Sequence, residues 1–309
     1  MRYPQAVLVS CEIPWDDRDR FDEALFRAEV RSALAKGFRH VYVFGTAGEG
    51  YAVDTPRFRD IVTVFRDETR GPDLHAQVGA IGLSTARVVE SLAFAHELGF
   101  RAFQISLPSW GVLNDTEVLT FFRDVCGTFP DSKFLHYNLP RAKRELGAAD
   151  YRRVADSVGN LAATKNTGRS IHEVRGLMRV VPEIQHFFGE SQFPVGCLFG
   201  ECSLLASFAA LFPRQTLEFF EYGRARQFDK LMPLWTRWLD VIDDFIEPTL
   251  PKALIDGAYD KMIVRLSGID FPLRLLSPYE SFPEEVFEAV RKTLNERHPD
   301  WMRAEEAAH

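Results

Sequence analysis

Cysteine is scarce in this sequence, and its spacing excludes the common paired-thiol motifs. Four cysteines occur among 309 residues, and no two of them are separated by only two residues. They are Cys11, Cys126, Cys197 and Cys202. Thiols spread in this way through a large chain are typical of reduced cysteines in cytosolic proteins. We therefore predict a cytoplasmic location and expect no metal site built on cysteine.

Long apolar runs and a surface of one charge are also missing. No stretch approaches the ~20 apolar residues of a transmembrane helix, and the first residues (MRYP) lack the apolar segment of a signal peptide. The net charge is −7, acidic and basic residues are interspersed, and the densest basic cluster is the short run at residues 141–144 (RAKR). This pattern argues against nucleic-acid and membrane partners.

Motifs for nucleotides and metals are missing as well. No GxGxxG follows the first apolar run, and the glycine-rich residues 45–50 lack the Gly-Lys-Ser/Thr of a Walker loop. His136, Glu49 and Asp54 do not have the close spacing that a local pair of metal ligands requires. We therefore expect no metal and no organic cofactor.

The sequence does contain short apolar runs that alternate with amphipathic stretches. The runs predict eight strands, at residues 6–10, 41–44, 75–80, 102–107, 134–138, 161–165, 185–188 and 204–207. The stretches between them predict helices at residues 21–35, 56–69, 85–98, 115–126, 149–158, 171–181 and 193–199. Alternating strands and helices imply a parallel sheet. Eight units predict a (β/α)8 TIM barrel over residues 1–213, and an open, doubly wound sheet is the alternative.

Residues 214–309 have a different pattern and predict a helical extension packed on the barrel. Residues 215–246 are helical throughout, with an interruption near Pro233, and further helices are expected at residues 252–266 and 283–297. Aromatic residues recur at helical spacing in this region, which is more typical of core or subunit contacts than of a binding site.

Three groups of residues with chemical potential stand at predicted strand ends. Lys165 ends an apolar run (LAATK), and a lysine in an apolar pocket is less favoured in its charged form. Its neutral amine can attack a ketone carbon and form a Schiff base. The backbone amides of residues 45–50 (GTAGEG) suit an anion such as a carboxylate. Tyr137 would point its hydroxyl into the barrel mouth, where it could transfer protons.

Each group also has a simpler interpretation. Lys165 could extend from a strand end into water, residues 45–50 could form a turn without a ligand, and Tyr137 could be a wall residue. Order and spacing favour the functional interpretation when the three groups are taken together. The sequence then resembles the dihydrodipicolinate synthase / N-acetylneuraminate lyase family of pyruvate-type class I aldolases.

The resemblance covers nearly the whole chain and rests on three motifs. Residues 45–49 (GTAGE) are similar to the family's Gly-[Ser/Thr]-Thr-Gly-Glu, and residues 137–140 (YNLP) to its Tyr-Asn-x-Pro. Residues 164–168 (TKNTG) resemble the segment around its Schiff-base lysine. The resemblance implies a lyase that acts on a small 2-oxo acid by aldol cleavage, condensation or dehydration. It also implies a homo-oligomer, a dimer or tetramer.

The resemblance further implies a role for individual residues. Lys165 would form the imine, Tyr137 would relay protons, and the hydroxyl of Thr46 would hydrogen-bond to that of Tyr137. The backbone amides of Thr46 and Ala47 would bind the substrate carboxylate. The residues expected to bind substrate are Gly45, Ala47, Trp110, Thr167 and Gly189.

Departures from the family pattern leave the substrate open. Ala47 replaces the second threonine of the signature, and Trp110 stands where the synthases have a tyrosine. An indole cannot act as an acid or base as a phenol does. The synthases' arginine could correspond to Arg141, Lys143 or Arg144. True 4-hydroxy-tetrahydrodipicolinate synthesis and non-catalytic binding of a 2-oxo acid or sugar acid are the two alternative functions.

Overall fold

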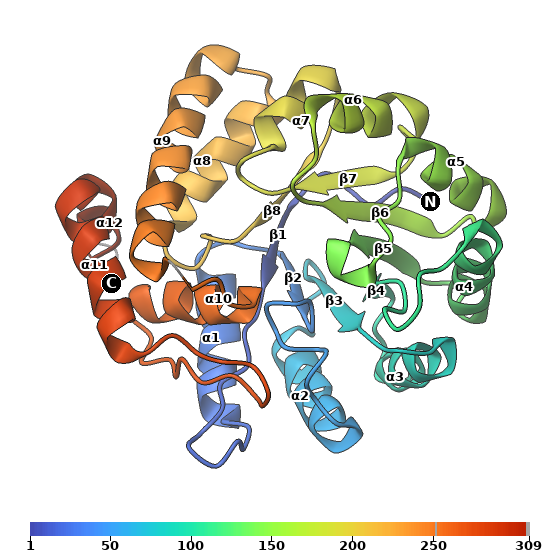
Figure 1. The fold of residues 1–309 in the computed structure, drawn as a ribbon, viewed down its shortest axis with the longest axis horizontal. Helices are drawn as coiled ribbons and strands as arrows, with labels where there is room; N and C mark the ends of the chain where they lie inside the picture. The colour runs from blue at the N-terminus through green and yellow to red at the C-terminus, as the bar shows by residue number, and fades with distance from the viewer. Residues whose placement is uncertain (251, 307–309) are drawn as a thin grey trace.

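A closed barrel of eight parallel strands forms the centre of the molecule. The computed structural model describes residues 1–250 and 252–306. The strands pair in chain order from β1 to β8, and β8 closes on β1 (Figure 1). They are β1 Val7–Ser10, β2 His40–Val43, β3 His75–Ala80, β4 Ala102–Ile105, β5 Lys133–Asn138, β6 Leu161–Asn166, β7 Gln185–Phe188 and β8 Ser203–Ala206. The predicted TIM barrel is confirmed, and the open sheet is excluded.

Helices surround the barrel and connect its strands (Figure 1). They are α1 Glu23–Ala35, α2 Thr55–Glu68, α3 Thr85–Glu97, α4 Asp115–Thr128, α5 Ala148–Ser157, α6 Ile171–Val180, α7 Phe193–Phe199 and α8 Pro213–Arg224. A short 3-10 helix, η1 Pro140–Ala142, follows β5. The expected helix ends agree to within about two residues. Asn114 caps α4 in a capping box with Glu117.

The C-terminal region differs from the prediction in three places. The expected single helix at residues 215–246 is two helices, α8 and α9 Phe228–Ile246, and the break lies at residues 225–227 instead of Pro233. Arg226 adopts a left-handed backbone with φ 54°, which cannot continue an α-helix. Pro233 lies inside α9, near its start. The helix expected at residues 252–266 begins only at Asp256, and the final helix was not predicted.

The remaining C-terminal elements gather beside β8 and α1 (Figure 1). They are η2 Glu247–Thr249, α10 Asp256–Leu266, α11 Glu284–Arg297 and α12 Pro299–Glu306. Helix α9 packs against α8 and α11. No helix in residues 1–250 and 252–306 combines the length and the apolar character needed to cross a membrane.

Two apolar cores lie on the two sides of the strands. The larger one fills the space between strands and helices, and the smaller one fills the barrel interior with residues that include Leu8, Tyr42, Leu135, Phe187 and Leu205. Successive side chains of a strand point to opposite faces, so each strand contributes to both cores. The interior core lies beneath the carboxyl ends of the strands and forms the floor of the candidate site.

Candidate active site

Lys165 and Tyr137 face each other at the carboxyl ends of two neighbouring strands. The register of β5 and β6 places the two residues side by side. Lys165 Nζ donates a hydrogen bond of 2.5 Å to the Tyr137 hydroxyl oxygen and lies 3.9 Å from the centre of the Tyr137 ring. The Lys165 residue is 8% exposed and Tyr137 is 4% exposed. The interpretation of Lys165 as a solvated strand-end lysine is therefore wrong.

An irregularity in the pairing of β5 and β6 sets this register. Phe134 pairs with Leu161, but the next residue, Leu135, pairs with Ala163, so one residue of β6 is passed over. An extra residue reverses which side chains face the interior beyond it. The shift therefore determines which β6 side chains beyond it point into the barrel, and it places Lys165 beside Tyr137. No local sequence pattern predicted this irregularity.

Buried hydrogen bonds hold the two strand ends on the outer side. Asn138 Nδ2 donates to Asn166 Oδ1 at 2.9 Å, and Asn166 Nδ2 donates to the Thr164 hydroxyl at 2.8 Å. That hydroxyl lies 2.8 Å from His186 Nδ1 on β7. Asn138 also hydrogen-bonds to the backbone N–H and C=O of Leu146. These contacts link β5, β6 and β7 immediately beside Tyr137 and Lys165, and they fix the distance between the amine and the phenol.

A cavity of about 630 Å³ opens above the pair. Its lining comes from the carboxyl ends of β1, β2, β5, β6 and β8 and from helices α9 and α10. In (β/α)8 barrels this face carries the active site. Of the residues predicted from the sequence, Lys165, Tyr137, Ala47 and Thr167 line the cavity. Loops and strands far apart in the sequence thus meet at one chamber, which we call the barrel chamber.

The glycine-rich loop reaches the rim of this chamber through an unusual backbone. Phe44, the residue after β2, has a left-handed φ of 66°. Its carbonyl oxygen lies so close to Gly79 that a Cβ added to Gly79 would be 2.1 Å from it. A Cβ on Gly45 would come within 2.5 Å of the Tyr42 ring. Glycine is therefore required at both positions. Gly45 is thereby placed for packing against Tyr42, and Ala47 is the loop residue that lines the chamber.

Thr46 is buried, but its hydroxyl is not bonded to Tyr137. The Thr46 hydroxyl has no hydrogen-bond partner in the described part of the chain. The expected Thr46–Tyr137 bond is therefore not formed in this structure. Within the same residues, neither the Thr46 amide nor the Ala47 amide donates to another backbone group. Two amides and a hydroxyl at this rim are thus available to an anionic ligand.

A buried ion pair anchors the other end of the glycine-rich loop. Glu49 accepts hydrogen bonds from Lys261 Nζ at 2.5 Å, from Trp15 Nε1 at 2.7 Å and from the backbone N–H of Leu276 at 2.8 Å. The side chains of Glu49 and Lys261 are both 0% exposed. Lys261 also donates to the carbonyl of Arg274. The pair fastens the loop to α10 and to the segment after it.

Three further carboxyl groups surround Lys165 at longer range, and none of them was among the site residues predicted from the sequence. Burial raises the pKa of Glu12 to about 7, opposed by a hydrogen bond with Ser10 and by the charges of Lys261 and Lys165. Burial also raises the pKa of Glu190, whose Oε1 accepts from the backbone N–H groups of Ser207 and Phe208. Both carboxyls therefore favour the protonated form more than a solvated glutamate does.

The third carboxyl, Asp260, lines the chamber from α10. Burial, with the neighbouring charges of Glu12 and Asp256, raises its pKa well above the usual range. Tyr42 lines the chamber from β2, and burial raises its pKa as well. Only one signal pointed to any of these groups: Glu12 and Glu190 each follow a predicted strand end.

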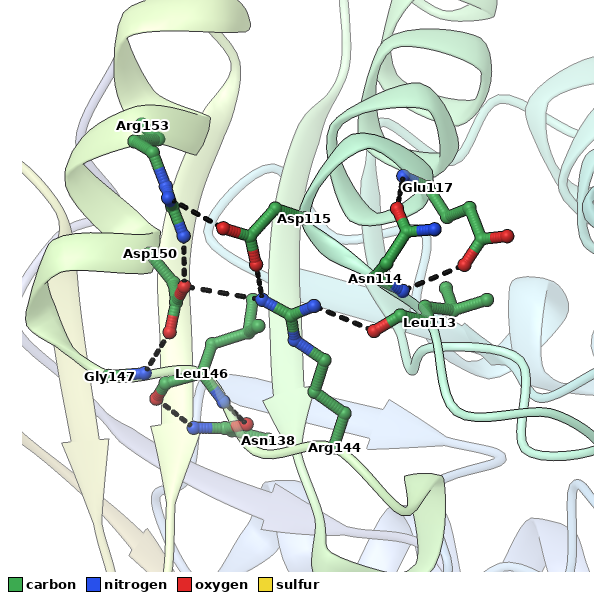
Figure 2. Close-up of polar contacts among 10 residues, drawn as sticks. All are labelled: Leu113, Asn114, Asp115, Glu117, Asn138, Arg144, Leu146, Gly147, Asp150 and Arg153. Carbon is green, nitrogen blue, oxygen red and sulfur yellow. Dashed lines mark hydrogen bonds and ion pairs between the residues drawn. The ribbon is translucent and has the colours of Figure 1, made fainter.

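Of the three basic residues after β5, only Arg141 lines the chamber. Its guanidinium forms two hydrogen bonds with the Asp256 carboxylate, at 3.0 and 2.8 Å. Arg144 instead bonds Asp115, Asp150 and the carbonyl of Leu113, away from the chamber (Figure 2). Lys143 donates to the carbonyl of Trp110. The choice that the sequence left open is thus decided by geometry.

The network in Figure 2 also joins the loop after β5 to the start of α4. Arg153 contacts both Asp115 and Asp150, so two arginines share two aspartates. Asp115, the first residue of α4, contacts both arginines. The loop that follows Tyr137 is therefore held at both ends, by Arg144 on the outside and by Arg141 at the chamber.

Besides Gly45, two predicted substrate-binding residues, Trp110 and Gly189, lie outside the chamber lining. Trp110 is 81% exposed, in the loop after β4. Gly189 follows β7, and its carbonyl accepts from the N–H groups of Gln192 and Phe193 at the start of α7. The Trp110 side chain is exposed, and its contact with substrate stays a prediction. Gly189 contributes to the loop that carries Glu190.

The described residues contain no group of three or more His, Cys, Asp or Glu side chains arranged to hold a metal ion. His136, considered as a ligand from the sequence, lies 2.8 Å from the Tyr151 hydroxyl, and burial lowers its pKa to about 3. Cys197 and Cys202, which look scattered in the sequence, have sulfur atoms 3.7 Å apart, and both are buried free thiols.

Comparisons with known proteins agree with this geometry. A sequence model described as the Dihydrodipicolinate synthetase family matches residues 4–297. N-acetylneuraminate lyase 2 of Escherichia coli O6:H1 is 22% identical over 296 residues, which cover 95% of each protein. The N-acetylneuraminate lyase of Citrobacter koseri is 22% identical over 198 residues, 63% of this chain and 66% of that protein. The chain thus matches just under two thirds of the length of this second relative.

The fold has a solved counterpart in YagE, a prophage protein of the dihydrodipicolinic acid synthase family from E. coli K12 that was crystallised in complex with pyruvate. The two structures superpose with a TM-score of 0.85 over 94% of this chain and 98% of YagE. Their sequence identity is 16%, so this likeness establishes the fold.

Proposed function

Because the chain belongs to the dihydrodipicolinate synthetase family, we propose that Lys165 forms a Schiff base with a pyruvate-type 2-oxo acid. Membership of this family, together with the N-acetylneuraminate lyase relatives, supports a pyruvate-type class I aldolase or lyase. The single observation that carries the proposal is the buried Lys165 amine, 2.5 Å from the Tyr137 hydroxyl, on the floor of the chamber.

The reaction begins with an exchange of bonds at the ketone carbon. The Lys165 amine adds to that carbon, and water leaves as the imine forms. The resulting iminium withdraws electrons from the adjacent carbon, which then releases a proton or, in cleavage, an aldehyde. Tyr137 is the proton carrier because its hydroxyl contacts the amine that becomes the imine nitrogen. Hydrolysis of the final imine returns the free amine.

The loop at residues 45–50 supplies the carboxylate site in this proposal. The amides of Thr46 and Ala47 would donate to the substrate carboxylate, and the Thr46 hydroxyl would bind it or Tyr137 once substrate is present. Ala47 lines the chamber and Thr46 has no hydroxyl partner among the described residues, which supports this assignment. Two fixed contacts to the carboxylate orient the ketone carbon toward Lys165, and orientation is a large part of such a rate enhancement. Thr167, at the chamber wall, is the proposed further contact to the substrate.

The assembly and location of the protein are also proposals. We propose a homo-oligomer in the cytoplasm, with residues 214–309 as a helical extension of the barrel. Trp110 and Val112, 81% and 65% exposed, form an apolar surface on the loop after β4 that favours self-association. The four free, buried cysteines are typical of a reducing compartment.

Borohydride trapping tests the proposed chemistry. Wild-type protein incubated with pyruvate and borohydride should gain one covalent adduct, and peptide mass spectrometry should locate it on Lys165 and not on the other buried lysine, Lys261. Lys165→Ala should gain none while keeping its circular dichroism spectrum. An adduct that persists in Lys165→Ala would overturn the assignment. Trapping without turnover on any 2-oxo acid would instead favour a non-catalytic binding protein.

A further inference from the structure

The barrel chamber has two walls of different chemistry. One wall, from β5 and β6, carries Tyr137, Lys165 and Thr167. The other wall, from β8, the residues after it and α9, with Ile263 of α10, is mainly apolar, and α10 adds the polar Asp256, Tyr259 and Asp260 beside it. The apolar side chains of this wall are Leu205, Phe208, Ile242, Phe245, Ile246 and Ile263, and we call this set the apolar wall. A 2-oxo acid held at Lys165 has its reacting carbon between these walls, so the second half of the substrate must lie against one of them.

The apolar wall follows from the sequence of α9. Ile242, Phe245 and Ile246 are spaced by three and four residues, which places them on one face of the helix. That face points into the chamber. Of the two acidic residues between them, Asp243 is exposed, and Asp244 contacts Arg297 and His298 on the outer side. The helix therefore offers hydrocarbon to the substrate and keeps its charge outside.

Charges at the chamber disfavour an anionic substituent on the aldehyde. Among the described residues that line the chamber, the cations are Lys165 and Arg141. Lys165 is the proposed nucleophile, and Arg141 is already bound by two contacts to Asp256. Asp260 adds a second carboxyl from α10. A carboxylate on the aldehyde would find no unpaired cation here.

A polyhydroxylated aldehyde is disfavoured for a different reason. Hydroxyl groups placed against Phe245, Ile242 and Ile246 would lose their hydrogen bonds to water without gaining new ones. A hydrocarbon substituent at the same place loses no hydrogen bonds, and its burial is favoured by the release of water. The apolar wall therefore favours a substrate with a hydrocarbon body. Burial raises the pKa of Asp260, which favours a protonated carboxyl that can donate one hydrogen bond.

We propose that the second substrate is an uncharged aldehyde with an apolar body, branched aliphatic or aromatic, which condenses with the 2-oxo acid or is released from the corresponding adduct. This inference rests on the proposed function. In condensation, the enamine carbon forms a bond to the aldehyde carbon, and the aldehyde oxygen accepts the proton that Tyr137 removed from the imine. Water then hydrolyses the imine, so pyruvate and aldehyde yield a 4-hydroxy-2-oxo acid with no other reactant.

Matched aldehydes of equal chain length test the preference directly. Wild-type protein would be given pyruvate with butyraldehyde, with succinic semialdehyde or with erythrose, which differ in a terminal methyl, a carboxylate and added hydroxyls. Condensation with butyraldehyde should show a kcat/KM at least about tenfold above that with either polar aldehyde, the scale on which apolar pockets discriminate. Benzaldehyde should react as well as butyraldehyde or better.

Substitution in the apolar wall provides the matched variants. Ile242→Asn should lower kcat/KM for butyraldehyde by about tenfold while pyruvate trapping at Lys165 is unchanged. Ile242→Val should stay within about twofold of wild type for butyraldehyde. Ile242 is only partly buried, so we expect both variants to fold, and pyruvate trapping verifies that they do.

The outcomes separate this inference from the function on which it rests. Normal trapping with equal or better reaction of succinic semialdehyde or erythrose would overturn the apolar preference and leave the Schiff-base function intact. Unchanged butyraldehyde kinetics in Ile242→Asn would also overturn it. Absence of pyruvate trapping in wild type would overturn the proposed function itself.

Discussion

Two lysines are buried in this protein, and they have different partners. Lys261, on α10, is 0% exposed and pairs with the equally buried Glu49 at 2.5 Å. Lys165, on β6, is 8% exposed and donates a hydrogen bond to the Tyr137 hydroxyl, also at 2.5 Å. The Lys261 amine is enclosed together with the Glu49 carboxylate, which compensates its charge. The Lys165 amine lies at the floor of a chamber that a small molecule can enter.

The comparison shows that burial by itself does not make a lysine a nucleophile. Burial lowers the pKa of Lys261, and Glu49 acts in the opposite direction by stabilising the ammonium. An ammonium held in this way has no free electron pair to attack a carbonyl. Lys165 has the Tyr137 hydroxyl as its bonded partner, while Glu12, Glu190 and Asp260 act only from a distance. Access and partner together support the proposed chemistry at Lys165 and an anchoring role for Lys261.

Removing the phenol partner should have the largest effect. Tyr137→Phe should lower turnover by roughly 10²–10⁴-fold, the usual contribution of a positioned acid–base group. Pyruvate trapping at Lys165 should persist at a reduced rate. Tyr259→Phe, which alters another tyrosine of the chamber lining, should keep turnover within a few-fold and serves as the control. Wild-type turnover in Tyr137→Phe would remove this hydroxyl from the mechanism.

Removing the charged partner of Glu49 should affect stability instead of chemistry. Lys261→Met should lower the free energy of unfolding, measured by urea denaturation, by about 3–5 kcal/mol, because it leaves a buried carboxylate unpaired. Adding Glu49→Gln should restore part of the loss. Lys252→Met, which breaks an exposed pair with Glu280, should change stability by less than about 1 kcal/mol. Equal losses for the buried and the exposed lysine would contradict the anchoring role of Lys261.

The smallest expected effect is on the pH dependence of stability, through Glu12, whose pKa is influenced by both lysines. Glu12 has a pKa of about 7 in the folded protein and about 4.3 when unfolded. Between these values the folded state binds the extra proton, so stability falls as pH rises toward 7 and levels off above it. Glu12→Gln should lack this fall, which has a slope of at most about 1.4 kcal/mol per pH unit.

Urea denaturation at a series of pH values measures this slope for wild type and Glu12→Gln. Exposed Glu97, replaced by glutamine, provides the control and should follow wild type. Glu29, Glu49, Lys165 and Lys261 act on Glu12 or stand near it, and they remain unchanged in both variants. Parallel curves for wild type and Glu12→Gln would show that the Glu12 carboxyl does not titrate in this range.

Most of the barrel could be predicted because its pattern is local. Buried strands and amphipathic helices alternate in the sequence, and residues 75–80, 185–188 and 193–199 were placed at both ends. The break between α8 and α9 could not be placed, because Arg226 enters the left-handed region without a glycine to mark it. Proline was taken as the interruption, but near the start of a helix it removes few hydrogen bonds.

The site was predicted where its residues stand at strand ends, and missed where they come from elsewhere. Lys165, Tyr137, Thr167 and Ala47 line the chamber as expected. Asp260 and the isoleucines of α9 lie in helices whose packing direction no local pattern reveals. Trp110 lies in an exposed loop outside the chamber lining, where Lys143 donates a hydrogen bond to its carbonyl.

The sequence by itself determined the parallel barrel, the family resemblance and the amine and phenol at two neighbouring strand ends, because these follow from short-range periodicity and from motifs within a few residues. Only the tertiary structure decided which buried lysine is open to a substrate, that Arg141 is paired with Asp256, and that α9 gives the chamber an apolar wall. Such contacts join residues more than a hundred positions apart, and the strand register and helix packing that create them exist only in the folded chain.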